Sequence, residues 1–307
     1  MHTDKIKSNK DQWPISILCV DDVENPKGVV QISHGMCEYK ERYIDFMQYL
    51  NTQGYICVIH DHRGHGQSIV DQNDLGYFGK NGDIKMCEDL YQVNQWIKGR
   101  YPFLPIIMLG HSMGSMLARK YIKTYDDTIS GLIICGSPSY NRFVTFAKTL
   151  TYLLSKIKGV HHRSTFINYL AFGLFNRKIK NAKSPHQWIC SDLKVVEAYD
   201  QDPLCNFIFT LNGFNQLFAI MESAYSLNDW HITQQLPIHF ISGIDDPCLI
   251  NVKKFNQALK RLKQVGYQNV TSKLYDGMYH EILNEKNKEE VYQDISNWLD
   301  KILFKDA

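Results

Sequence analysis

The pentapeptide at residues 110–114, Gly-His-Ser-Met-Gly, is the part of the chain whose residue types most clearly suggest chemistry. An apolar run precedes it at residues 105–109, and a helix-like pattern follows at residues 113–125. A strand, the pattern G-x-S-x-G and a helix together are typical of a nucleophile elbow, a strained turn that presents a serine hydroxyl. We therefore expect Ser112 to be a catalytic nucleophile rather than part of a structural turn.

A nucleophilic serine needs a general base and a carboxylate that orients the base, and after an elbow these follow in the order Asp or Glu, then His. One strand-like run ends just before Asp245 and Asp246, and the next ends just before His280. His280 is the expected base for Ser112. Asp246 is the expected acid because Pro247 follows it and stiffens the turn. Asp245 is the alternative acid, which would otherwise be a solvated loop carboxylate.

The loop after an early strand should supply one of two oxyanion donors. The apolar run at residues 27–33 leads into His34, Gly35 and Met36. We expect the backbone N–H groups of Met36 and Met113 to be the donors. His34 has two interpretations, a second catalytic base or a structural residue that fixes the loop by hydrogen bonding, and the structural one is favoured.

The elements that must position these residues alternate between apolar strands and amphipathic helices. The strands lack polar alternation, which indicates a mostly parallel central sheet with helices on both faces. Asp83 is the expected N-cap of a helix with Met86, Leu90, Val93 and Ile97 on one face. The runs that predict strands are residues 15–20, 27–33, 55–60, 105–109, 132–135, 236–243 and 270–275.

The regular alternation stops between residues 138 and 228, where helical patterns and aromatic residues dominate. We interpret residues 138–228 as a helical lid inserted between two parts of one α/β core, residues 1–137 and 229–307. Such a lid would line an apolar acyl pocket and make transient membrane or micelle contact, although each aromatic alone is better explained as packing on the core. The aromatics are Phe143, Phe146, Tyr152, Phe166, Tyr169, Phe172, Phe175, Trp188, Phe207, Phe214 and Phe218.

Taken together, these motifs resemble the monoacylglycerol lipase and lysophospholipase branch of the α/β-hydrolases, which is also described as serine-aminopeptidase-like. The resemblance covers nearly the whole chain from about residue 15 and implies the α/β-hydrolase fold. It also implies triad roles for Ser112, Asp246 and His280 and oxyanion roles for Met36 and Met113. The chain departs from the family pattern in the lid. The matching stretches are residues 34–38, 41–43, 61–68, 110–114, 202–205, 243–247 and 279–283.

The composition is typical of a cytoplasmic enzyme. The chain has 307 residues, a formal net charge of +2 and 21% charged residues, which argues against a nucleic-acid partner. Its eight cysteines follow no C-x-x-C pattern, so a reducing compartment is expected. The first ten residues lack the apolar run of a secretory signal, and no stretch approaches membrane-spanning length.

No cofactor or metal is expected. The His60-x-His62 and His161-His162 pairs lack further ligands at a recognisable spacing. The glycine-rich loop at residues 61–68 lacks the lysine pattern of a phosphate-binding loop, which favours a structural turn.

The expected reaction is hydrolysis of a carboxylic ester through an acyl-enzyme, with single-acyl lipids as substrates. A short-chain esterase and an aminopeptidase-like peptidase are the alternatives, and a perhydrolase would share the same triad. A peptidase would need a carboxylate to bind a free amino terminus. Dehalogenases and epoxide hydrolases on this fold use an aspartate nucleophile, so Ser112 argues against them, and an inactive binding module would commonly lack a triad member. The carboxylates available for a peptidase are Glu197, Asp200, Asp202 and Glu222.

Overall fold

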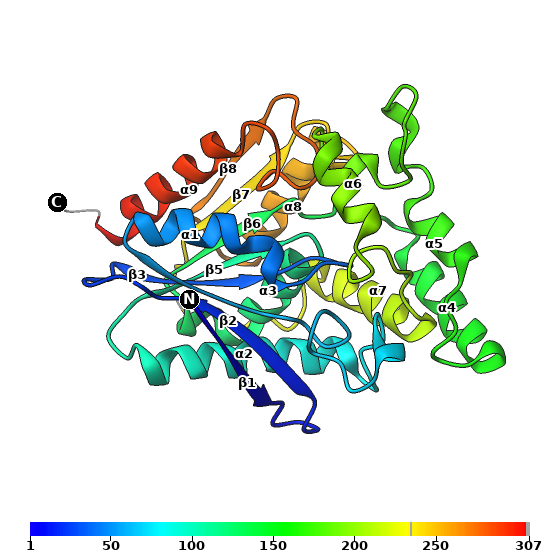
Figure 1. Ribbon diagram of the computed structural model, residues 1–307, viewed down its shortest axis with the longest axis horizontal. Coiled ribbons are helices and arrows are strands. Elements are labelled where there is room, and N and C mark those ends of the chain that lie inside the picture. The colour runs from blue at the N-terminus through cyan, green and yellow to red at the C-terminus, as the bar shows by residue number, and fades with distance from the viewer. Residues whose placement is uncertain (234, 305–307) are drawn as a thin grey trace.

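The computed structural model describes residues 1–233 and 235–304 and is built on one eight-stranded sheet (Figure 1). Its strand order is β1-β2-β4-β3-β5-β6-β7-β8. β1 and β2 run antiparallel to their neighbours, whereas β3 to β8 are parallel to one another. The strands are β1 (His2–Lys7), β2 (Pro14–Val20), β3 (Gly28–Ser33), β4 (Tyr55–His60), β5 (Ile106–His111), β6 (Gly131–Cys135), β7 (Ile238–Gly243) and β8 (Val270–Tyr275).

The central strands are buried along their whole length, as expected for a parallel sheet covered on both faces. The edge strand β1 was not predicted, because its sequence His-Thr-Asp-Lys-Ile-Lys contains one apolar residue. It forms by pairing with β2, with Ile6 opposite Ile15. Charged side chains on such an edge disfavour pairing with another chain.

Helices cover both faces of the sheet. α1 (Ile44–Thr52) and α9 (Lys288–Leu303) pack on one face, and α2 (Gly82–Arg100), α3 (Met113–Tyr125) and α8 (Val252–Val265) pack on the other. The predicted N-cap at Asp83 is wrong. α2 already begins at Gly82, after Asn81 in the left-handed conformation, and the Asp83 carboxylate instead pairs with Lys120 Nζ at 2.7 Å.

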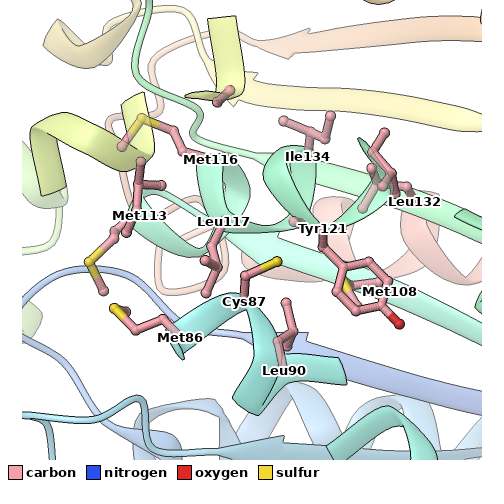
Figure 2. Close-up of a cluster of buried hydrophobic side chains, with 14 of the residues drawn as sticks. Met86, Cys87, Leu90, Met108, Met113, Met116, Leu117, Tyr121, Leu132 and Ile134 are labelled. Atoms are coloured by element: carbon pink, nitrogen blue, oxygen red, sulfur yellow. The ribbon is translucent and has the colours of Figure 1, made fainter. Parts of the chain in front are cut away.

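A cluster of apolar side chains from α2, α3, β5 and β6 packs around the helix that follows Ser112, α3 (Figure 2). Burying each large apolar side chain stabilises the fold by roughly 1.5–3 kcal/mol, so this cluster fixes α3 firmly against the sheet. The start of α3, where the serine lies, is therefore part of a rigid element. The labelled members are Met86, Cys87, Leu90, Met108, Met113, Met116, Leu117, Tyr121, Leu132 and Ile134.

Residues 138–228, called here the helical segment, contain four α-helices and no strand. α7 packs on α3, α4 packs on α7, and α4 and α5 lie at the end of the molecule farthest from the C-terminus (Figure 1). In the part of the chain that the structure describes, no helix has both the length and the apolar character needed to cross a membrane. The helices are α4 (Val144–Lys158), α5 (Thr165–Phe172), α6 (Leu193–Gln201) and α7 (Leu211–Tyr225).

Candidate active site

Ser112 is the single residue that joins β5 to α3, and its backbone is strained. Its φ is +52° and its ψ is −117°, a conformation that costs a non-glycine residue free energy. A Cβ atom on Gly114 would lie 2.0 Å from the carbonyl oxygen of Ser33, and one on Gly110 would lie 2.6 Å from that of Gly114. Only glycine fits at either position, so the sequence forms the sharp elbow that its G-x-S-x-G pattern predicts.

The structure brings Ser112, His280 and Asp246 into one chain of hydrogen bonds. His280 Nε2 lies 2.8 Å from Ser112 Oγ, and His280 Nδ1 lies 2.9 Å from Asp246 Oδ2. With Nδ1–H donating to the carboxylate, Nε2 is free to accept the serine proton. His280 and Asp246 are each 3% exposed, whereas Ser112 is partly open to solvent. This is the geometry that nucleophilic catalysis by serine requires.

The carboxylate that reaches His280 belongs to Asp246, and Asp245 is exposed. Asp246 Oδ1 also accepts a hydrogen bond from the Cys248 backbone N–H at 2.8 Å, and Oδ2 accepts one from the Ser242 hydroxyl at 3.1 Å. These donors fix the carboxylate beneath the imidazole. A buried, hydrogen-bonded carboxylate can hold the imidazole in one tautomer and stabilise it when it becomes charged.

The sheet explains why these distant residues meet. β5, β6, β7 and β8 are parallel neighbours, so the loops after them all lie at their carboxyl ends, the edge where ligands bind in α/β proteins. The loops after β7 and β8 touch, because a Cβ atom on Gly243 would lie 2.0 Å from the Met278 carbonyl oxygen. That contact brings Asp246 within reach of His280.

The expected oxyanion loop lies against the nucleophile. A Cβ atom on Gly35 would lie 2.9 Å from Ser112 Cβ, so the backbone after β3 approaches the serine closely. Within residues 1–233 and 235–304, the backbone N–H groups of Met36 and Met113 donate no hydrogen bond. Two unpaired N–H groups beside a serine hydroxyl are suited to stabilise developing negative charge on a substrate oxygen.

His34 braces this loop through both ring nitrogens. Nδ1 lies 2.8 Å from the Gly35 carbonyl oxygen, and Nε2 accepts a hydrogen bond from the His62 backbone N–H at 2.9 Å. Burial lowers the pKa of His34, which keeps the ring neutral with its proton on Nδ1. The geometry therefore favours the structural interpretation of His34, because neither nitrogen is left for a catalytic proton.

A buried ion network behind the site was not predicted from the sequence. Glu38 Oε1 accepts hydrogen bonds from the Gly35 backbone N–H, from the Tyr43 hydroxyl at 2.9 Å and from His111 Nδ1 at 2.9 Å. Glu38 Oε2 lies 3.2 Å from Arg42 Nη1. One carboxylate thus connects the oxyanion loop to the residue that precedes the nucleophile.

The same network reaches the histidine loop. Arg42 binds Glu281, the neighbour of His280, through two hydrogen bonds of 2.7 Å. Glu38 and Arg42 are charged residues four apart within the matching stretches at residues 34–38 and 41–43, and this spacing was the available signal in the sequence. With His111 protonated, two cations balance two carboxylates, which reduces the cost of burying four charges.

We expect Glu38→Gln to destabilise the fold by about 3–5 kcal/mol, because one partner of a buried ion network is lost. Burial lowers the pKa of His111, but the Glu38 charge and hydrogen bond outweigh it, so the net shift is upward from 6.5. Because the pKa of His111 is higher in the folded state than in the unfolded state, its protonation stabilises the fold fully at pH values below the unfolded-state pKa. This stabilisation is lost as the pH rises through the folded-state pKa.

The loss on Glu38→Gln should therefore be largest near pH 6 and shrink as the pH rises above it. Thermal unfolding of both proteins across this pH range measures the difference. Glu24→Gln, at an exposed glutamate, is the matched control. A Glu38→Gln loss that is the same at every pH would contradict the coupling to His111.

The helical segment closes over the histidine with an aromatic wall. The Trp188 ring centre lies 5.0 Å from that of His280, and Phe172 stacks parallel to Trp188. The Glu281 backbone N–H donates to the Ile189 carbonyl oxygen at 2.7 Å, which ties this wall to the histidine loop. The Ser112 hydroxyl therefore has apolar surroundings on the side that faces the helical segment.

Two groups of side chains among the described residues are spaced closely enough to bind a metal ion. One is His2, Cys19 and Asp21 at the sheet edge. The other is Asp246, Cys248 and His280, whose Asp–His hydrogen bond already serves the serine. Burial raises the pKa of the Cys248 thiol well above 9, which disfavours the thiolate that a metal needs. The histidine pairs at residues 60–62 and 161–162 belong to neither group.

The fold and the arrangement around Ser112 define an α/β-hydrolase. Residues 24–287 match the family described as "Serine aminopeptidase, S33", and the chain belongs to that family. Both the predicted fold class and the predicted family are confirmed.

Relatives and solved structures agree with this assignment. The chain is 28% identical to a monoacylglycerol lipase of Mycolicibacterium smegmatis over 90% of this chain and 89% of the relative. It is 26% identical to a phospholipase of Bacillus subtilis over 91% and 98% of the two chains. A thermostable carboxyl esterase from Bacillus coagulans superposes with a TM-score of 0.90 at 27% identity, over 99% of each chain.

Proposed function

We propose that this carboxylic-ester hydrolase acts on esters of single-acyl lipids, such as monoacylglycerols and lysophospholipids, with Ser112, His280 and Asp246 as its triad. The observation that carries the proposal is the continuous hydrogen-bond chain from Ser112 Oγ through His280 to Asp246. The names of the lipase and phospholipase relatives support the substrate class.

In the proposed mechanism, Ser112 Oγ attacks the ester carbonyl while His280 Nε2 takes its proton. The oxyanion accepts hydrogen bonds from the N–H groups of Met36 and Met113. The protonated His280 then gives its proton to the leaving alcohol, which leaves an ester between the acyl group and Ser112. A water that loses a proton to His280 attacks this acyl-enzyme, and the acid departs as the proton returns to Ser112.

We further propose that residues 138–228 act as a lid between the two core parts, residues 1–137 and 229–307, and make transient contact with a membrane or micelle. Aromatic packing from Trp188 over His280 supports an apolar acyl site beneath the segment. An acyl chain would pack against apolar side chains there, where burial of each CH₂ contributes about 0.8 kcal/mol.

A peptidase is less well supported, because the carboxylates that would bind an amino terminus have partners within the chain. Asp200 pairs with His186 at 2.6 Å, and Asp202 accepts the Tyr39 hydroxyl at 2.7 Å. Glu222 binds Lys148 and Thr145, and Glu197 accepts from the Gln201 amide at 3.3 Å. Each of the four therefore already accepts a hydrogen bond from another side chain of the described structure.

Initial rates on a series of esters test the substrate proposal. The series contains monoacylglycerols and p-nitrophenyl esters of rising acyl length, one lysophospholipid and an aminoacyl amide. We expect kcat/KM to rise with acyl length by up to about fourfold per CH₂ until the apolar site is filled. Turnover confined to the shortest acyl chains would contradict the lipid proposal and favour a short-chain esterase. Turnover of the amide alone would favour a peptidase.

A further inference from the structure

Part of the helical segment carries an unusual charge. Residues 138–191 contain no Asp or Glu, although the chain has 32 of them. The rest of the chain therefore has 25 of the 34 Lys and Arg residues and all of the acids, and it is net negative. The nine basic residues of this acid-free stretch are Arg142, Lys148, Lys156, Lys158, Arg163, Arg177, Lys178, Lys180 and Lys183.

Most of these cations face solvent without a carboxylate. Lys148 pairs with Glu222, and Arg163 donates to the backbone carbonyl of Ile208. The other seven are exposed, and in the described part of the chain none of them forms an ion pair. They are Arg142, Lys156, Lys158, Arg177, Lys178, Lys180 and Lys183.

α4 presents an apolar stripe to solvent among these cations. Phe146, Leu153 and Ile157 are 66%, 54% and 81% exposed. Their spacing of seven and four residues places them on one face of the helix. The helix packs on α7, and its Leu150 and Leu154 pack against the hydrophobic core. α4 therefore has two apolar faces, and only one of them is covered.

α5 repeats this arrangement. Phe166, Tyr169 and Leu170 are 56%, 61% and 54% exposed, at helical spacings of three and four residues, and Leu174 follows one turn later. Ile167 faces the other way and is buried. An apolar patch of this extent on the surface of a protein marks an interaction site.

We propose that the basic apolar face, defined as the exposed side chains of residues 142–183, which include α4 and α5, docks on an anionic lipid bilayer. Exposed aromatic and aliphatic side chains flanked by lysine and arginine are suited to lie in the headgroup region of a membrane with negative surface charge. α4 and α5 are at one end of the molecule, so this face can meet a flat surface (Figure 1).

Charge and apolar exposure together favour an anionic bilayer over the two other candidate partners, a second copy of the chain and a nucleic acid. In a symmetric dimer through the same face, seven unpaired cations would meet seven more and repel. A nucleic acid would neutralise the charge but leave the apolar stripes of α4 and α5 in water. The proposal rests on exposure and charge rather than on catalysis, and it adds a lipid-charge preference to the proposed lid contact.

Co-sedimentation with sucrose-loaded vesicles tests the proposal. Wild type and Ser112→Ala are each mixed with vesicles of phosphatidylcholine alone and of phosphatidylcholine with phosphatidylglycerol. We expect both proteins to bind the anionic vesicles at least roughly tenfold more tightly, since each Lys or Arg near such a surface contributes about a fivefold change. Equal behaviour of the two proteins separates docking from the proposed function.

Substitutions on α4 test whether the basic apolar face is the surface that binds the vesicles. Lys156→Gln with Lys158→Gln should weaken anionic-vesicle binding by roughly 25-fold, about fivefold for each lysine, while Lys5→Gln with Lys7→Gln, on the exposed edge of β1, should leave it unchanged. Leu153→Ser with Ile157→Ser should weaken binding as well, because insertion needs the apolar stripe. Circular dichroism confirms that each variant is folded.

Several results would overturn the proposal. These are equal binding to both vesicle types, no binding to either, or a loss caused equally by the β1 control. Insensitivity to Leu153→Ser with Ile157→Ser would indicate polyanion binding without insertion. A dimer that those substitutions break, together with absent vesicle binding, would show that a second copy covers the face.

Discussion

Ser112→Ala is expected to lower kcat for ester hydrolysis by roughly 10⁴- to 10⁶-fold, because it removes the atom that attacks the carbonyl. The residual rate would come from the oxyanion donors and substrate binding. The substitution removes one hydroxyl at a partly exposed position, so the melting temperature should change little. Steady-state kinetics on a p-nitrophenyl ester, at enzyme concentrations high enough to detect the residual rate, measures the effect.

Ser130→Ala is the matched control, since Ser130 is an exposed serine just before β6. It should retain wild-type kcat and KM. If Ser112→Ala kept more than about a hundredth of the wild-type kcat, the nucleophile would be another group and the elbow would have a structural role only.

Asp246→Asn is expected to lower kcat by roughly 10⁴-fold at neutral pH. The amide cannot stabilise the imidazolium, and its NH₂ group would oppose Nδ1–H and favour the wrong tautomer of His280. KM should change far less, because Asp246 lies behind the imidazole and reaches Ser112 only through it.

Asp245→Asn provides the comparison that decides between the two candidate acids. Asp245 is exposed, and its substitution should leave kcat within about twofold of wild type. A large loss of kcat from Asp245→Asn, with little loss from Asp246→Asn, would contradict the proposed triad and make Asp245 the functional acid.

The sequence was most informative where chemistry and local geometry restrict the same residues. The elbow could be predicted because Gly110 and Gly114 are positions where any Cβ would strike backbone. At the loop after β7, Pro247 follows the buried Asp246, which hydrogen-bonds His280, whereas Asp245 is exposed. Such constraints act over a few residues and can be seen in a single sequence.

Features that depend on distant partners were not predicted. The Glu38 network joins residues far apart in the chain, Glu38, His111 and Glu281, and no local pattern shows that they meet. The edge strand β1 forms by pairing with β2 despite a polar sequence. The prediction of Asp83 as an N-cap was wrong because α2 already begins at Gly82, and the Asp83 carboxylate binds Lys120 on the next helix. In each case a tertiary contact outweighs the local preference.

The most direct test of the central claim is to trap the acyl-enzyme. Wild type is mixed with a p-nitrophenyl ester, quenched in acid within the first turnovers, digested and analysed by mass spectrometry. The account predicts one acyl group per chain, attached to Ser112, appearing with a burst of p-nitrophenol. Steady release of p-nitrophenol with no acylated peptide, or an acyl group on any other residue, would contradict the proposed mechanism.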